Sequence, residues 1–168
     1  MDKPLVNRVA QSSLITINLE DFFPKEEIMV FDMKEFLFRE LILREKDFRE
    51  AMSNHDWTQY SNKNLAILCS TDAIIPTWAY QLVTVNAAPY AKMIVHGSKD
   101  QLISEMYYRE LSDLNLDKFR DQKIVIKGCS DKPVPVSAYV ELTRILQPIA
   151  QSIMFGEPCS TVPIFKKK

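Results

Sequence analysis

Short apolar runs alternate with longer helical stretches from residue 63 onward, and this alternation constrains the fold more than any other feature of the chain. The runs are continuous and rich in Ile, Val and Leu, which is typical of strands that are buried on both faces. They lie at residues 65–68, 93–95, 124–126 and 153–155. Helical stretches separate them, at residues 77–88, 100–118 and 136–147. The alternation predicts right-handed crossovers and an α/β fold with a mainly parallel sheet in three layers.

The first 62 residues lack this regular alternation. Residues 14–19 and 28–31 have the β-branched content of short strands, and residues 45–54 have the apolar spacing of a helix. We interpret residues 1–62 as an N-terminal mixed α/β appendage of a core at residues 63–168. A chain of 168 residues falls within the common size range of one domain, so we predict a single domain.

Two segments of the core repeat each other, which indicates a duplicated βαβ unit. The segment that begins at Cys69-Ser70 aligns with the one that begins at Cys129-Ser130 when one gap is placed at Thr71. Identical residues continue through both segments: Pro76 with Pro135, Tyr80 with Tyr139, Thr84 with Thr143, Pro89 with Pro148 and Gly97 with Gly156. The strands that open the two copies are then expected to be neighbours in one sheet, and the predicted order of the four strands is 2-1-3-4.

This order would bring Cys69 and Cys129 to the carboxyl ends of adjacent strands, about 4.8 Å apart. In open α/β sheets such a gap is where ligands bind. Cys159 also follows a strand and precedes a serine, so we predict that all three thiols lie at one edge of the sheet. Three thiolates suit a zinc ion, or an iron–sulfur cluster with one further ligand.

The predicted crevice also contains polar side chains. Its candidate residues are Asp72, Asp131, Lys132, Ser70 and Ser130 for a bound group, and His96 as a further metal ligand. Purely structural roles also stay open for these residues. The cysteines are equally compatible with a role as small buried side chains, and the two aspartates with a role as helix caps. No C-x-x-C motif is present, so the cysteine spacing alone indicates neither zinc nor redox chemistry.

Glycine use excludes the familiar nucleotide-binding loops. Gly97, Gly128 and Gly156 are far apart, whereas the dinucleotide and Walker loops need several glycines in one turn. The G-x-S-x-G elbow of serine hydrolases is also absent. The net charge of −1 does not indicate the excess of basic side chains that is typical of proteins that bind nucleic acid or an anionic membrane.

Targeting features point to a cytoplasmic protein. The N-terminus has no apolar core of a signal peptide, and no apolar stretch approaches the roughly 20 residues of a membrane span. Three cysteines cannot form a closed disulfide framework within one chain. We therefore predict a reduced, cytoplasmic protein without a membrane or nucleic-acid partner.

Five segments of the chain resemble domain-of-unknown-function family 2480. They are residues 43–51, 55–57, 69–80, 128–135 and 155–163. The resemblance covers nearly the whole chain and implies a cytoplasmic protein of Bacteroidetes-type bacteria with no established activity. It further implies an association with iron–sulfur assembly proteins as partners.

Three functions are compatible with these observations, and whether the chain is an enzyme stays open. The first is a metal-binding or iron–sulfur protein that uses the three cysteines. The second is a thiol enzyme of sulfur transfer, in which one cysteine is the nucleophile. The third is a binding or assembly module whose cysteines serve only for packing.

Overall fold

The chain forms two compact units. The computed structural model describes residues 14–128 and 131–168. Unit 1 comprises the described residues up to Phe23 and those from Met106 onward, and unit 2 runs from Pro24 to Glu105. Helix α3 (Lys99–Ser112) contributes residues to both units. No helix of the described part of the chain is long and apolar enough to cross a membrane.

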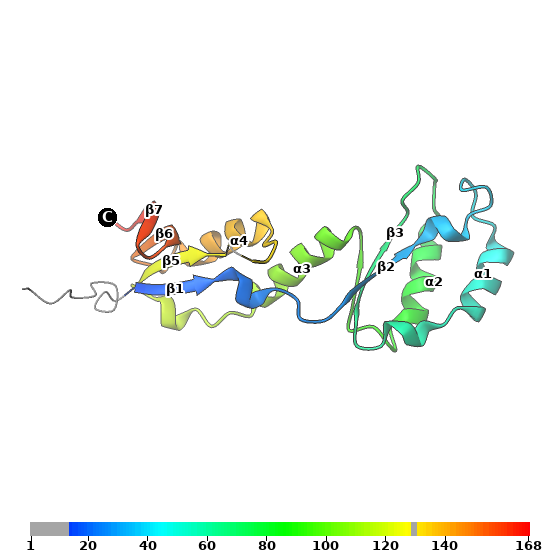
Figure 1. Cartoon of the computed structure of the whole chain (residues 1–168), viewed down its shortest axis with the longest axis horizontal. Helices are drawn as coiled ribbons and strands as arrows, with labels where there is room; N and C mark the ends of the chain where they lie inside the picture. Colours follow the sequence, from blue (N-terminus) through cyan, green and yellow to red (C-terminus); the bar gives the residue numbers. More distant parts are fainter. Residues whose placement is uncertain (1–13, 129–130) are drawn as a thin grey trace, which may run out of the picture. The chain divides into compact units, whose positions relative to one another are not determined.

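Unit 2 contains a parallel sheet of three strands. The strands are β2 (Ile28–Asp32), β3 (Asn64–Leu68) and β4 (Met93–His96), in the order β2-β3-β4. Its helices are α1 (Glu45–Asn54) and α2 (Thr77–Ala87), with 3-10 helices η2 (Met33–Phe36) and η3 (Trp57–Tyr60) (Figure 1). The core is rich in aromatic side chains, and the Trp57 indole N–H donates to the Met52 carbonyl at 2.9 Å. Burial of these rings together with the aliphatic side chains of the same cluster drives the folding of this unit.

Unit 1 contains a mixed sheet of four strands. They are β1 (Leu14–Asn18), β5 (Lys123–Lys127), β6 (Ser152–Glu157) and β7 (Ser160–Lys166). The order is β1-β5-β6-β7; β1, β5 and β6 are parallel, and β7 returns antiparallel to β6. Short 3-10 helices η1 (Leu19–Phe22) and η4 (Asp117–Phe119) follow β1 and precede β5.

Helix α4 (Val136–Leu146) packs on this sheet (Figure 1). Ala138, Leu142 and Leu146 are four residues apart, which places them on one face of the helix, and all three are buried. They pack in the same unit as the buried strand residues Ile124 and Ile153. The helix is therefore anchored by one apolar face, while other residues of the same helix stay available to a site.

The α/β class, the mostly parallel pairing and the four predicted strands are confirmed, but the single sheet of order 2-1-3-4 is not. The predicted strands 65–68 and 124–126 lie in β3 and β5, which belong to different sheets. The two strands are not neighbours because each is the central strand of its own sheet, and both of its edges already pair with other strands. β3 pairs with β2 and β4, whereas β5 pairs with β1 and β6. The strands that we assigned to an appendage therefore complete the two sheets.

The two units show the same order of elements around their central strands. Each has a first strand that leads into a 3-10 helix, then a central strand, a loop, an 11-residue helix and a third strand. The first strands even end alike: the side chain of Asn18 accepts from the N–H of Glu20, and that of Asp32 accepts from the N–H of Lys34. Duplication as the origin of this likeness stays a prediction.

Candidate functional site

The carboxyl edge of the unit 2 sheet carries the first group of predicted residues. Cys69 directly follows β3 and is half-buried with a free thiol. Asp32, at the end of the neighbouring strand β2, accepts a hydrogen bond from the N–H of Ser70 at 3.0 Å. Burial alone would raise the pKa of Asp32, but hydrogen bonds from Ser70 and Lys34 outweigh it and lower that pKa. Asp32 is thus an ionised anchor for the loop that contains Cys69.

His96 and Tyr80 lie at the same edge of unit 2. The imidazole of His96, at the end of β4, meets the Tyr80 ring of α2 edge to face, with ring centroids 4.9 Å apart. Burial raises the pKa of Tyr80, and the nearby charges of Cys69 and Asp32 raise it further. The carboxylate of Asp32 is therefore a formal charge that lies beside both the Tyr80 hydroxyl and the loop that contains Cys69.

The predicted metal centre is not found among the residues that the structure describes. In that part of the chain, no three His, Cys, Asp or Glu side chains gather closely enough to hold a metal ion. Cys69 belongs to unit 2, whereas Cys159 is exposed in the tight turn between β6 and β7 of unit 1. Cys129 and Ser130 lie outside the described residues. A zinc or iron–sulfur site that includes Cys129 stays a prediction.

The remaining predicted residues are divided between the two units. Asp72 is exposed in the loop after β3, and Asp131 and Lys132 are exposed in the loop after β5. Because β3 and β5 belong to different sheets, the crevice that was expected to pair the two aspartates is not formed by adjacent strands. The helix-cap interpretation also fails, since α2 and α4 begin after Pro76 and Pro135 without any side-chain cap.

Lys132 and Asp131 are held by the buried residue Glu20. The N–H of Asp131 donates to the Glu20 carboxylate at 3.0 Å, and the Lys132 ammonium donates to the Glu20 carbonyl at 3.2 Å. Glu20 in unit 1 thus anchors the loop after β5 much as Asp32 in unit 2 anchors the loop after β3. Both carboxylates hold loops in place, which is a structural role.

Tyr139 and Gly128 define the carboxyl edge of the unit 1 sheet. The Tyr139 ring of α4 meets the Phe155 ring of β6 edge to face, with centroids 5.8 Å apart. Gly128 has a φ of +152°, and a Cβ added there would lie 3.1 Å from the Tyr139 hydroxyl. Glycine is therefore needed both for the backbone conformation and for the close approach of Tyr139.

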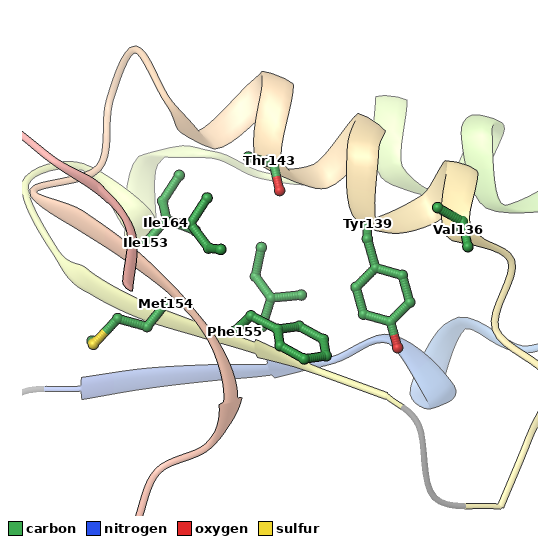
Figure 2. Close-up of a pocket in the computed structure, with 8 residues that line it drawn as sticks. Val136, Tyr139, Thr143, Ile153, Met154, Phe155 and Ile164 are labelled. Carbon is green, nitrogen blue, oxygen red and sulfur yellow. The ribbon is translucent and has the colours of Figure 1, made fainter. Parts of the chain in front are cut away.

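A pocket that the sequence did not predict opens beside this tyrosine (Figure 2). Its volume is about 340 Å³, and its walls are α4 and the strands β5, β6 and β7. None of its lining side chains is charged; they are Ile126, Val136, Tyr139, Thr143, Ile153, Met154, Phe155 and Ile164. Ile126 and Ile153 are buried and form the floor, whereas Val136 is 77% exposed and Ile164 is 53% exposed.

An irregularity of the β6–β7 pairing supplies one wall of the pocket. Ile153 pairs with Phe165 and Met154 pairs with Pro163, so Ile164 is an extra residue opposite that step. A bulge of this kind turns a side chain away from its regular direction. Ile164 consequently lines the pocket, whereas Val162 on the same strand is exposed and does not.

Comparison with known proteins identifies the family but no activity. The family model described as "Protein of unknown function (DUF2480)" matches residues 3–167, so the chain belongs to this family. No curated protein and no solved structure matched the chain.

Proposed function

We propose that this member of the DUF2480 family is a binding protein that holds a neutral, apolar ligand in the pocket between α4 and strands β5 to β7. The observation that carries this proposal is the uncharged lining of a pocket of about 340 Å³. Small-molecule sites span about 300–1,000 Å³ and are lined mainly by apolar and aromatic side chains with a few polar groups. The pocket meets both criteria.

The exposure of the rim supports binding over a purely structural role. Val136, Phe155 and Ile164 line the pocket and remain accessible to water. Apolar surface left in contact with water is unfavourable by roughly 25 cal/mol for each Å² that a ligand would cover. A ligand that fills the pocket would recover that free energy without any rearrangement of the floor.

The chemistry of the lining favours binding over catalysis. Apart from the Met154 thioether, its polar side-chain groups are the hydroxyls of Tyr139 and Thr143. Neither hydroxyl is a general acid or base near neutral pH without an activating partner in the lining. This supports the third function that the sequence left open, a binding module.

The test is a titration of the full chain with the neutral fluorescent probe N-phenyl-1-naphthylamine. Ile164→Asp places a carboxylate in the wall, and we expect it to weaken probe binding by at least about tenfold because an unpaired charge would be covered. Val162→Asp is the matched control, since it adds the same charge to the same strand outside the pocket. Equal binding by both variants, or no saturable binding by the parent, would contradict the proposal.

A further inference from the structure

Helices α2 and α4 carry the same residue types at several equivalent positions, so a difference in the contacts of two equivalent residues can indicate a role that is specific to one helix. Both have 11 residues, and both begin directly after a proline. Tyr80 and Tyr139 are the fourth residues of their helices, and Thr84 and Thr143 are the eighth. In both helices the carbonyl of this threonine accepts a hydrogen bond from the backbone N–H of the residue that directly follows the helix.

The hydroxyl groups of the two threonines behave differently. The Thr84 hydroxyl donates to the Tyr80 carbonyl of its own helix at 2.8 Å, which satisfies it. The Thr143 hydroxyl makes no hydrogen bond to any residue that the structure describes, although its side chain is half-buried. Figure 2 shows its oxygen directed from α4 toward the strands, into the pocket.

A hydroxyl that is directed into an apolar pocket offers a hydrogen bond to a ligand, because a ligand that fills the pocket displaces the water that can otherwise reach the hydroxyl. Among the other polar groups of the lining, the Met154 sulfur already accepts from the Thr161 hydroxyl. The bound molecule is then the natural partner for Thr143. The uncharged lining disfavours an ionised group there, because its lost hydration would not be replaced.

We infer that the ligand is a neutral, mainly hydrocarbon molecule that carries one hydroxyl or carbonyl group, and that this group pairs with the Thr143 hydroxyl. The inference rests on the proposed function and adds the chemical class of the ligand and the residue that orients it. Thr143 is a hydrogen-bonding anchor in an otherwise apolar site, which is how such pockets obtain specificity.

Two neutral probes of similar size test the inference on the full chain. 1-Naphthol offers a hydroxyl, and 1-methylnaphthalene offers a methyl group at the same place. Thr143→Val keeps the shape of the side chain and removes its hydroxyl. We expect this variant to bind 1-naphthol about fivefold more weakly, as for the loss of one neutral hydrogen bond. Its affinity for 1-methylnaphthalene should be unchanged or higher, which also shows that the variant is folded.

Thr84→Val is the matched control, because it removes the equivalent hydroxyl from α2 and should leave both affinities unchanged. If Thr143→Val alters the two affinities by the same factor, or alters neither, the hydroxyl is not the anchor and the inference is wrong. That outcome leaves the proposed function intact, since both probes still bind. If neither probe binds to the parent protein, the proposed function itself fails.

Discussion

At the scale of single residues, a histidine and a tyrosine in unit 2 form a neutral pair inside an aromatic cluster. His55 Nε2 lies 2.9 Å from the Tyr60 hydroxyl, and the His55 ring also meets Trp57 and Phe31 edge to face. Burial raises the pKa of Tyr60 to about 12, so its hydroxyl keeps its proton near neutral pH while it shares a hydrogen bond with the imidazole. Burial lowers the pKa of His55, although Asp56 and Glu35 oppose this.

This pair predicts the sign of a pH effect on stability. The pKa of His55 is lower in the folded chain than in the unfolded chain, so protons bind preferentially to the unfolded chain. The contribution of neutral His55 to the free energy of unfolding is therefore fully present above its unfolded-state pKa of about 6.5. It is lost as the pH falls through the lower pKa that His55 has in the folded chain. Urea unfolding at pH 7.5 and pH 5.5 should show a lower midpoint at pH 5.5, with a smaller difference for His55→Gln.

His96→Gln is the control for this experiment, because His96 is exposed and is the other histidine of the chain. It should keep the pH dependence of the parent. If His96→Gln flattens the pH dependence and His55→Gln does not, the assignment to His55 is wrong.

At the scale of elements, α4 has a double role, since one face holds the unit 1 core and another lines the pocket. Leu142 is fully buried, and Val140 is 64% exposed on the same helix. Leu142→Ala should lower the free energy of unfolding by about 2–5 kcal/mol, because it leaves a cavity under the helix. Val140→Ala should change it by less than about 0.5 kcal/mol. Similar costs for the two variants in urea unfolding would contradict this packing.

The central strands could be predicted from the sequence because each is a short, continuous apolar run, and the helices because they fill the longer stretches between these runs. Residues 65–68 and 124–126 became β3 and β5 for this reason. Their partners could not be predicted, because a buried strand carries no mark of which neighbour fills its edge. The strands at residues 14–18 and 28–32 fill those edges, far from β5 and β3 in the sequence.

The pocket could not be predicted for a related reason. It depends on the bulge that turns Ile164 inward, and a bulge is a feature of two paired strands rather than of one. One signal was present in the sequence: Val136, which lines the pocket, is an apolar residue of α4 outside the face that Leu142 buries. An excess of apolar residues on the outside of a helix indicates a surface that binds something.

At the scale of the whole molecule, neither of the two cysteines that the structure describes lines the proposed binding site. Cys69 belongs to unit 2, and Cys159 lies in the turn of the β6–β7 hairpin outside the lining of the pocket. Replacing Cys69 and Cys159 together by serine should therefore leave the affinity for N-phenyl-1-naphthylamine unchanged within about twofold. Loss of probe binding in this double variant would show that one of the two thiols, or a group bound to it, supports the site.

The central claim is that unit 1 binds a neutral apolar ligand in the pocket beside α4. The most direct measurement is an NMR titration of the isotope-labelled full chain with 1-naphthol. The account predicts saturable shifts of backbone amides at Tyr139, Thr143 and Phe155, with little change at Cys69 and Tyr80 of unit 2. Shifts that concentrate at Cys69 and Tyr80, or the absence of saturable shifts at the pocket, would contradict it.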